Sequence, residues 1–411
     1  MFYMRDLPYV IITEKAERSA KAGHPWVYAD EITGTNGEIV DGELVDVYSK
    51  KERFIGTGFY NSHSKIRVRI ISANANDKFD RAFYERRIRY ALDYQKTVMG
   101  EDFHACRLIF GEADMFPGLT VDLFETVLSV QVFSLGVDKI IDMLLDILVT
   151  MLPEYGVTVR GVYLRNDVAI RELEGMEQFT GYWKPESFPG AADSDGTVIM
   201  TENGIKYKVD YINGQKTGFF LDQKYNRRAA ASLAKGKTVL DCFTHTGAFG
   251  LNCAKAGAAH VNSVDISESA VQMAQANAEL NGLTGNMTFT CADVFELLTE
   301  MAEQKRHDYD YIILDPPAFT KSQTTVHNAY NGYKEINLKA MKLLPRGGYL
   351  ATCSCSHFMG DELFRKMLAD AARDAKVNLR QIEARTQSPD HPILWNVRET
   401  DYLKFYLFQV V

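Results

Sequence analysis

Apolar and polar positions alternate in short runs from residue 1 to about residue 72. The runs ELVDVYS (43–49) and KIRVRIIS (65–72) show this alternation. A period of two is typical of strands that bury one face, and the dipeptide Asn36-Gly37 favours a tight hairpin turn. The pattern predicts a small β-barrel over residues 1–72.

The apolar spacing changes to that of a helix after the predicted barrel. Phe83, Ile88 and Leu92 recur at helical intervals within 79–100, which predicts a helix that leaves the barrel. A stretch rich in Gly, Pro and Asp at 184–196 reads as a boundary. We therefore expect a central α+β domain over residues 73–190, with strands near 107–112, 119–125, 127–134 and 161–167 around an apolar helix at 139–155.

Strand and helix patterns alternate from residue 191 to residue 411. This alternation predicts an α/β domain, a mostly parallel sheet with helices on both faces. Ligands of such Rossmann-like sheets bind at the carboxyl ends of the strands. The expected strands that precede helices are 237–243, 260–266, 287–293, 309–317 and 347–355, and two more follow near 379–387 and 402–411.

The net charge of −8 disfavours a general polyanion binder. The segment 65–96 differs, because it carries nine basic residues against four acidic ones. Arg86, Arg87 and Arg89 are its candidates for contacting RNA, although a solvated helix face would have the same composition.

The cysteines and the N-terminus indicate a cellular compartment. The six cysteines include no CxxC pair and no disulfide-framework spacing, which favours reduced thiols. We expect no signal peptide at the N-terminus, and no window of the sequence is apolar enough for a membrane span. The sequence therefore predicts a soluble, cytoplasmic protein.

Acidic residues end three successive predicted strands. Asp241 precedes a turn that contains Gly247 and Gly250, Asp265 follows about 24 residues later, and Asp293 ends the third strand. Asp265 is placed to accept hydrogen bonds from both ribose hydroxyls, and Asp293 to meet an adenine amine. Each Asp would also suit a helix N-cap. The chain has neither GxGxxG nor a P-loop, so S-adenosyl-L-methionine fits better than nicotinamide cofactors or nucleoside triphosphates.

The fourth and fifth predicted strands end in DPPAF and in TCSCS. If these strands are parallel neighbours, Asp315-Pro316-Pro317 and Cys355 face one crevice. The rigid diproline edge, with Phe319, would hold a planar base. A thiol beside it suits methylation at carbon 5 of a pyrimidine, because a thiolate that adds to carbon 6 makes carbon 5 nucleophilic.

Two cysteines are candidates for that nucleophile. Cys355 lies at the strand end and is the favoured one, whereas Cys353 is expected in the core. A metal clip is disfavoured because two more ligands at zinc spacing are missing. A redox pair is disfavoured because the spacing is not CxxC.

Nearly the whole chain resembles one known family. The stretches GQKTGFFLDQKYNRR, LDCFTHTGAFGLNCAKAGA, ILDPPAF, SCSHFM and DHPILWNVRETDYLKF are similar to those of the S-adenosylmethionine-dependent ribosomal RNA large-subunit methyltransferase I family. That family makes 5-methylcytidine in bacterial large-subunit (23S) ribosomal RNA. Residues 1–72 are similar to its PUA domain, an RNA-binding module, and 191–411 to its class I methyltransferase domain.

The resemblance implies roles for individual residues. Cys355 would be the nucleophile. The C-terminal DHP…E…YLK pattern is met by Asp390, His391, Pro392, Glu399, Tyr402, Leu403 and Lys404, although ILWNVR lacks the proline expected before the glutamate. The cofactor would lie among Lys216, Thr217, Gly218, Phe219, Phe220, Leu221, Asp222, Phe243, His245, Thr246, Asp265, Ser267, Asp293 and Asp315, with Asp241 and Gly247 from the strand-end pattern.

Several alternatives stay open. The same fold and cofactor would serve methylation of a guanine ring nitrogen, which needs no thiol, or of uridine at carbon 5. A non-catalytic RNA-binding assembly factor is the third reading. The proton acceptor is Asp315 or a bound water, and the sequence leaves a homodimer open.

Overall fold

The computed structural model describes residues 7–188, 194–320 and 322–411. The chain divides into two compact units. The expected boundaries at residues 72 and 190 stay predictions, and residues 189–193 of the proposed boundary segment lie outside the described residues. The first unit comprises 1–198, 209–221 and 389–400, and the second comprises 199–208, 222–388 and 401–411.

The N-terminal part of the first unit forms a six-stranded sheet in the order β2-β6-β5-β4-β1-β3. Its strands pair antiparallel except for β1 and β4, which run parallel. Val10, Val27, Val47 and Val68 are fully buried in its core, as the period-two pattern predicts. The elements are β1 (Tyr9–Ile12), α1 (Glu14–Lys21), β2 (Trp26–Tyr28), β3 (Ile32–Asn36), β4 (Leu44–Ser49), β5 (Phe54–Tyr60) and β6 (Ile66–Ser72).

The tight hairpin expected at Asn36-Gly37 is wrong. β3 ends at Asn36, but it pairs with β1, and β4 begins only at Leu44. Since β1 lies between β3 and β4, the chain must pass its end, and a two-residue turn is too short to do so. Gly37 still has a positive φ of 84°, so the glycine serves a turn within a longer loop.

The second sheet of the first unit has five strands in the order β11-β10-β9-β8-β7. The predicted helix after the barrel is confirmed as α2 (Arg81–Met99), which Asp80 caps by accepting from Phe83 N–H and which buries Phe83, Ile88 and Leu92. The other elements are β7 (Ala105–Phe110), β8 (Leu119–Phe124), β9 (Val127–Val132), α3 (Leu135–Met151), β10 (Gly161–Asn166), α4 (Ile170–Leu173) and β11 (Phe179–Tyr182).

The second unit contains a seven-stranded sheet in the order β16-β15-β14-β17-β18-β20-β19. The first five strands in this order run parallel, and β20 and β19 pair antiparallel at one edge, so the predicted mostly parallel sheet is confirmed. The strands are β14 (Thr238–Cys242), β15 (His260–Asp265), β16 (Met287–Cys291), β17 (Tyr311–Leu314), β18 (Tyr349–Ser354), β19 (Leu379–Arg385) and β20 (Lys404–Val410).

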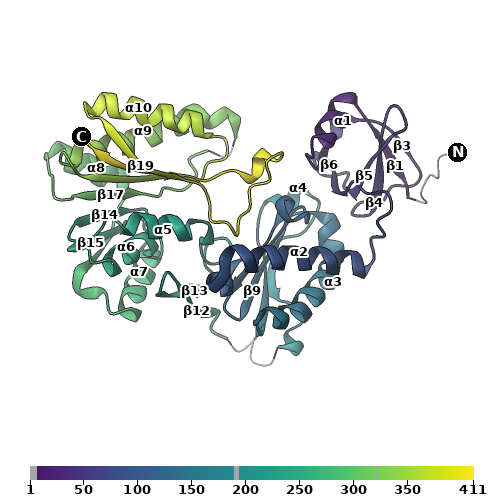
Figure 1. Ribbon diagram of the computed structural model, residues 1–411, viewed down its shortest axis with the longest axis horizontal. Helices are drawn as coiled ribbons and strands as arrows, with labels where there is room; N and C mark the ends of the chain where they lie inside the picture. The colour runs from purple at the N-terminus through teal and green to yellow at the C-terminus, as the bar shows by residue number, and fades with distance from the viewer. Residues whose placement is uncertain (1–6, 189–193, 321) are drawn as a thin grey trace. The chain divides into compact units, whose positions relative to one another are not determined.

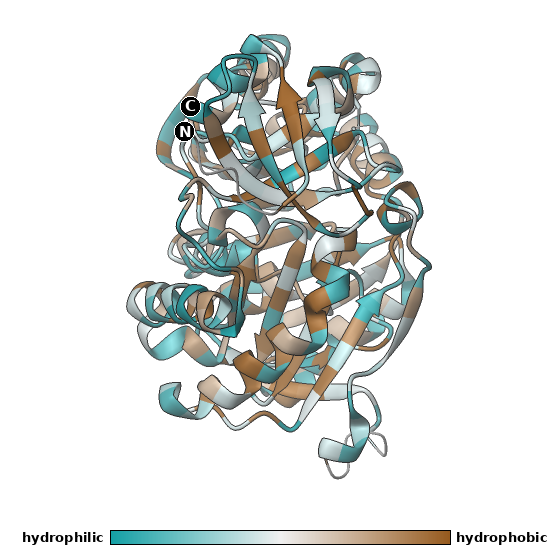
Figure 2. Ribbon diagram, turned by 90° about the vertical axis from the view of Figure 1, so that its right-hand side faces the viewer, coloured by the Kyte–Doolittle hydropathy of each residue, from teal (hydrophilic) through white to brown (hydrophobic). Residues whose placement is uncertain are grey.

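Helices cover both faces of this sheet, with α8, α9 and α10 on one face and α5, α6 and α7 on the other (Figure 1). Apolar residues are concentrated on the strands (Figure 2). Residues 199–208 join the second unit through the hairpin of β12 (Thr197–Glu202) and β13 (Ile205–Asp210), where Glu202 pairs with Arg227 at 2.6 Å in a fully buried ion pair. The helices are α5 (Lys224–Ala231), α6 (Ala248–Lys255), α7 (Glu268–Leu280), α8 (Val294–Glu303), α9 (Val326–Leu343) and α10 (Asp361–Ala375).

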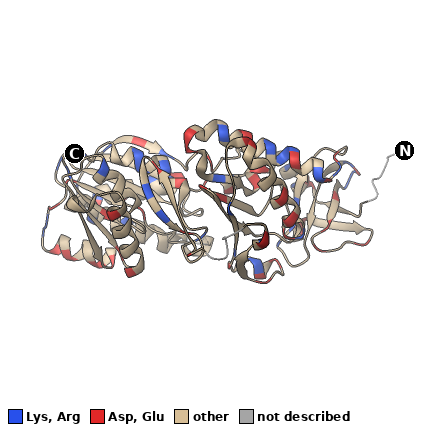
Figure 3. Cartoon of the chain, turned by 90° about the horizontal axis from the view of Figure 1, so that it is seen from below, with Lys and Arg blue, Asp and Glu red and all other residues tan. Residues whose placement is uncertain are grey.

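Charged residues of both signs are interspersed along the chain (Figure 3). Within α2 itself, Arg81 pairs with Glu85 at 2.8 Å. Among the described residues, no helix is both long and apolar enough to span a bilayer.

Candidate active site

The turn that follows β14 has an unusual backbone. Phe243, His245 and Gly247 have φ values of 62°, 49° and 85°, all in the left-handed region. Glycine adopts this region freely, but the two other residues cost free energy there and persist only where the surroundings hold them. Strained turns of this kind cluster at functional sites, which fits a loop that approaches a ligand.

The Asp241 side chain stabilises this turn through hydrogen bonds. Its fully buried carboxylate accepts hydrogen bonds from Gly250 N–H at 2.8 Å and from the Thr244 hydroxyl. Burial raises the pKa of Asp241 to about 6. Asp241 lies one residue inside β14, and these contacts support a positioning role, while a direct contact with the cofactor stays a prediction.

Asp265 ends β15, as predicted, and its carboxylate is fixed by the backbone on both sides. Oδ2 accepts from His245 N–H at 2.9 Å, and Oδ1 accepts from Ser267 N–H at 3.0 Å. Ser267 in turn caps α7 by accepting from Ala270 N–H. A carboxylate held in this way at a strand tip is preorganised to accept hydroxyl donors.

Asp293 lies two residues beyond the end of β16 and caps α8. It accepts from Phe295 N–H at 2.7 Å and from Glu296 N–H at 3.3 Å. The capping role is thus what the contacts show, and a contact with adenine stays a prediction. The Phe243 and Phe295 rings, 6.4 Å apart, provide an apolar wall next to it.

The motif residues before Asp222 fall in the first unit. Lys216 is exposed and its ammonium lies 4.7 Å from the centre of the Phe220 ring. Thr217 is fully buried, and its hydroxyl donates to Asp122 Oδ2 at 2.5 Å. Phe219 and Leu221 are buried too. Cofactor contacts of 216–221 therefore stay predictions.

Asp222 and Gln223 open the part of the motif that lies in the second unit. Asp222 Oδ2 accepts from the Tyr402 hydroxyl at 2.6 Å, and Gln223 Nε2 donates to Asp315 Oδ1 at 2.9 Å. Burial raises the pKa of Asp315 to about 7, and the like charge of Asp222 adds to this shift. Asp315 thus titrates near neutral pH.

The predicted adjacency of the DPPAF and TCSCS strands is confirmed. β17 and β18 pair in parallel, with Leu314 opposite Thr352, so Asp315 and Cys355 both follow the carboxyl ends of neighbouring strands. Cys353 is fully buried, and burial raises the pKa of its thiol well above 9. Cys355 is half-buried at the strand end. The structure therefore confirms that Cys353 is buried, with its thiol in contact with Gln223 and Asp315.

The residues of the DPPAF loop differ in their exposure and packing. Pro316 is buried and Pro317 is exposed. The half-buried Phe319 packs against Tyr333, with ring centres 4.4 Å apart, and the Tyr333 hydroxyl lies 2.8 Å from Ser356 Oγ. Phe319 thereby connects the loop to α9, while a contact of these residues with a base stays a prediction.

Lys404 lies beside the end of β18, the strand that Cys355 follows. β20 pairs antiparallel with β18 so that Lys404 is opposite Ser354, and its Nζ donates to the carbonyls of Ser356 and Tyr402 at 2.8 Å each. Burial lowers the pKa of Lys404 to about 8, and the nearby Cys355 opposes this shift. A buried ammonium next to a thiol favours the thiolate.

Sequence reasoning did not give roles to Lys404, Gln223 or Tyr333. Lys404 and Gln223 stand within quoted motifs, so a signal was present, but their partners depend on strand register. Tyr333 has no sequence signal beyond its place on a predicted helix. The DHP…E…YLK pattern is divided, because Asp390 through Glu399 belong to the first unit and Tyr402 through Lys404 to the second.

Comparisons with known proteins agree with this geometry. Residues 10–73 match the PUA-like domain, and residues 187–409 match the S-adenosylmethionine-dependent methyltransferase family. The chain is thus an S-adenosylmethionine-dependent methyltransferase with a PUA-like domain.

Relatives define the family more closely. The ribosomal RNA large subunit methyltransferase I of Pseudoalteromonas atlantica is 39% identical over 397 residues, covering 96% of this chain and 97% of the relative. Those of Aeromonas hydrophila and Shewanella denitrificans are 38% and 40% identical, covering 96% and 94% of this chain and 97% and 96% of the relatives. The chain belongs to the ribosomal RNA large subunit methyltransferase I family.

Solved structures share the fold. A protein of Streptococcus mutans assigned as a SAM-dependent methyltransferase superposes with a TM-score of 0.80 at 22% identity, covering 98% of this chain and all of that one. A second structure, of a protein assigned as a methyltransferase in complex with SAH, gives a TM-score of 0.82 at 22% identity with the same coverage.

The site residues fit the family's cofactor, S-adenosylmethionine. The buried Thr246 hydroxyl oxygen has no hydrogen-bond partner among the described residues. An orphaned buried donor is costly unless a ligand satisfies it, and the carboxylate of the methionine moiety would do so. Asp265 would hold the ribose, and the bound cofactor supplies an electrophilic methyl group.

Replacing Asp265 by Ala tests the ribose site. We expect S-adenosylmethionine binding to weaken by about 2–4 kcal/mol, because hydrogen bonds to a charged acceptor contribute about 1.5–3 kcal/mol each before water compensates. Calorimetric titration measures this change. Asp308→Ala, at an exposed carboxylate paired with Arg306, is the matched control and should bind normally. Normal affinity of a folded Asp265→Ala protein would show that the ribose is held elsewhere.

Proposed function

We propose that this protein methylates carbon 5 of a cytidine in large-subunit (23S) ribosomal RNA through a covalent adduct with Cys355. The observation that carries the proposal is the half-buried Cys355 at the end of β18, next to the strand that leads into Asp315. The names of relatives that are 38–40% identical support the RNA substrate. Such a substrate would place the enzyme in the cytoplasm.

The chemistry requires a thiolate, a rigid seat for the base and a proton acceptor. The Cys355 thiolate adds to carbon 6 of the cytosine, and its electron pair makes carbon 5 an enamine-like nucleophile. Carbon 5 takes the methyl group and becomes tetrahedral. Removal of the carbon-5 proton then allows the carbon 6–sulfur bond to break, which restores the aromatic ring and the thiolate. The products are 5-methylcytosine, the demethylated cofactor and one proton.

Asp315 is our candidate for the proton acceptor. A general base works best when its pKa is near the working pH, and the pKa of Asp315 is raised to about 7. Gln223 Nε2 donates to Asp315 Oδ1 at 2.9 Å and orients the carboxylate. Only the ionised form accepts a proton, so this step should become faster as the pH rises through about 7.

Lys404 is our candidate for activating the thiol. Its ammonium donates to the carbonyl of Ser356, the neighbour of Cys355, at 2.8 Å. With a pKa of about 8, most of its population is charged at neutral pH, and that charge is lost above pH 8. The positive charge would stabilise the thiolate that attacks carbon 6.

The alternatives differ in their need for Cys355. Methylation of a guanine ring nitrogen would proceed without a thiol. Uridine methylation would use the same adduct and differ only in how the polar edge of the base is recognised. A non-catalytic assembly factor would use neither Cys355 nor the cofactor's methyl group.

The Cys355→Ser variant tests the nucleophile. Methyl transfer to ribosomal RNA should be abolished while cofactor affinity is unchanged, because a serine hydroxyl is a far poorer nucleophile than a thiolate. Cys353→Ser is the matched control and should retain most activity with some loss of stability. RNA with 5-fluorocytidine at the target should trap a covalent complex with the wild type and with Cys353→Ser only. Full activity of Cys355→Ser, or trapping that depends on Cys353, would contradict the assignment.

The Asp315→Asn variant tests the proton acceptor. We expect turnover to fall by about 100- to 10,000-fold, the usual contribution of a general base. Because methylation precedes proton removal, this variant should accumulate a covalent complex with ordinary, unfluorinated RNA on denaturing gels. Asp308→Asn serves as the control. Near-normal turnover of Asp315→Asn would favour a bound water as the acceptor, and loss of activity without that complex would show that Asp315 acts at or before methyl transfer.

The Lys404→Met variant tests thiol activation. Alkylation of Cys355 by iodoacetamide at neutral pH should slow by about tenfold or more. A nearby opposite charge changes the pKa of a group by about 1–3 units, so loss of the ammonium should raise the pKa of the thiol and leave less thiolate to react. Mass spectrometry of the labelled peptide measures the rate. Lys339→Met, at a partly exposed lysine paired with Glu335, should leave the rate unchanged. An unchanged rate in Lys404→Met would remove Lys404 from the mechanism.

A further inference from the structure

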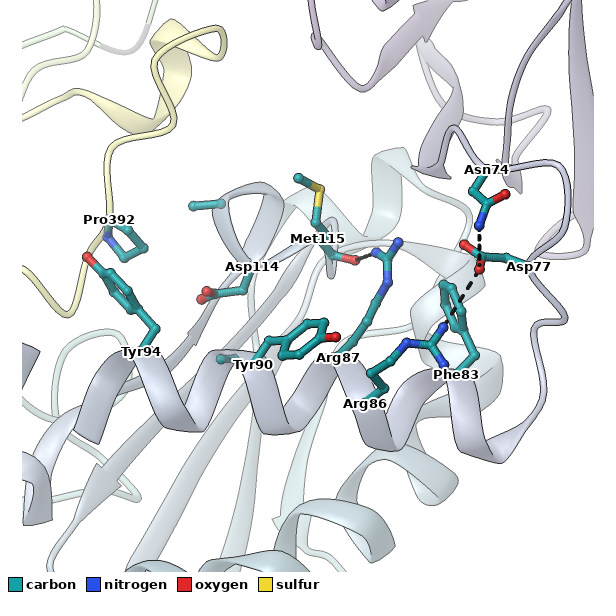
Figure 4. A pocket seen from close by; sticks show the side chains of 12 residues that line it. Asn74, Asp77, Phe83, Arg86, Arg87, Tyr90, Tyr94, Asp114, Met115 and Pro392 are labelled. Carbon is teal, nitrogen blue, oxygen red and sulfur yellow. Dashed lines mark hydrogen bonds and ion pairs between the residues drawn. The ribbon is translucent and has the colours of Figure 1, made fainter. Parts of the chain in front are cut away.

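A pocket of about 670 Å³ lies in the first unit, apart from the residues of the active site (Figure 4). It lies along one side of α2 and is bounded by the loop at 113–115, by Asn74 and Asp77 ahead of the helix, and by Pro392. Its volume is in the range of sites that bind small molecules or single nucleotides.

Two arginines form one end of the pocket. Arg87 is held rigidly, because it donates to the Met115 carbonyl at 3.2 Å and its guanidinium lies 4.4 Å from the centre of the Phe83 ring. Arg86 is 49% exposed and only loosely paired with Asp77 at 3.7 Å. A loosely paired guanidinium beside a rigid one suits a phosphate, which accepts several parallel N–H donors.

Exposed apolar surface forms the rest of the wall. Tyr90 and Tyr94 are four residues apart on α2, so they share one face, and they are 65% and 38% exposed. The Tyr94 hydroxyl donates to the Pro389 carbonyl at 3.0 Å, which fixes that ring at the Pro392 end. Met115, 44% exposed with φ of 61°, lies on the opposite side. The open Tyr90 ring provides a platform on which a planar base can stack.

One carboxyl group faces this apolar surface. Asp114 Oδ2 accepts from Phe110 N–H at 2.6 Å, which fixes the side chain at the pocket wall. Burial raises the pKa of Asp114 to about 6, so the group is mostly ionised at neutral pH. A carboxylate in this position accepts from the exocyclic amino group of a base such as cytosine.

We propose that this pocket binds one unpaired nucleotide of the RNA substrate, with its base on Tyr90, its phosphate at Arg86 and Arg87, and a base amino group on Asp114. The inference rests on the proposed function in so far as the substrate is RNA. A base stacked inside a duplex cannot enter such a pocket, so the site selects single-stranded RNA. Of the three arginines expected to contact RNA, the proposal keeps Arg86 and Arg87. Arg89 is left out, because it forms a bidentate pair with Glu154 at 2.7 and 3.2 Å and does not line the pocket.

The test measures binding of fluorescein-labelled oligocytidylate and oligouridylate hexanucleotides to the full-length protein by anisotropy. Tyr90→Ala should weaken binding by about 5- to 150-fold, as expected for one lost stacking contact. Arg86→Ala should weaken binding and lower the slope of log affinity against log salt by about 0.7. Asp114→Asn should shift the preference from cytidine toward uridine, because an amide presents a donor to the base.

Arg89→Ala is the matched control, since it removes the same charge from the same helix outside the pocket. It should leave affinity for the hexanucleotides and the salt slope unchanged. If Arg89→Ala loses as much affinity as Arg86→Ala, or if Tyr90→Ala binds like the wild type, the pocket proposal is overturned.

Methylation of ribosomal RNA, assayed in parallel, separates this proposal from the proposed function. If Tyr90→Ala binds RNA as tightly as the wild type and the protein methylates ribosomal RNA, the pocket proposal is overturned and the proposed function stands. Binding that depends on Tyr90 in a protein that methylates no RNA would overturn the function and support the pocket.

Discussion

β17 and β18 run parallel at the centre of the seven-stranded sheet, and Leu314 of one strand lies opposite Thr352 of the other. Neighbouring parallel strands are about 4.8 Å apart, so this register alone brings Asp315 and Cys355 to the same edge of the sheet. A slip of one residue would turn Cys353 and every other side chain of β18 to the opposite face of the sheet. The central position of both strands, with β14 and β20 on either side, fixes the register through burial on both faces.

Burial then gives chemically similar side chains different roles. Two cysteines on one short stretch differ because Cys353 lies within β18 and Cys355 beyond its end. Two aspartates at neighbouring strand ends differ in the same way. Asp241 is enclosed by its own turn and braces it, whereas Asp315 stands at the loop where its pKa of about 7 suits proton transfer. Position relative to the strand end, more than residue type, separates structural groups from candidate catalytic ones.

Much of the fold could be predicted from the sequence because its signals are local. Alternating strands and helices predicted the parallel sheet, and Phe83, Ile88 and Leu92 predicted α2. The short, polar α1 was missed, because its eight residues include a single buried one, Ala16. The hairpin at Asn36-Gly37 was wrong because turn chemistry does not reveal which strands pair.

The site was predictable to the extent that strand ends converge in a parallel sheet. The rule selected Asp265, Asp315 and Cys355 as candidates, and each lies at or just beyond the carboxyl end of its strand. The rule does not say which carboxylates are already satisfied by the protein, so it could not foresee that Thr217 is bonded to Asp122, and it left capping by Asp293 as an alternative. Lys404 depends on the antiparallel register of β20 with β18, a pairing separated by some fifty residues of chain, which no local pattern specifies.

The proposed reaction forms a carbon–carbon bond at a pyrimidine of ribosomal RNA. The most direct measurement is to incubate the protein with cofactor carrying a tritiated methyl group and with ribosomal RNA lacking its modifications. The RNA is then digested and the labelled nucleoside identified by chromatography. We expect the label to elute as 5-methylcytidine. Label in a methylguanosine, or no transfer of label by a protein that binds the cofactor, would contradict it.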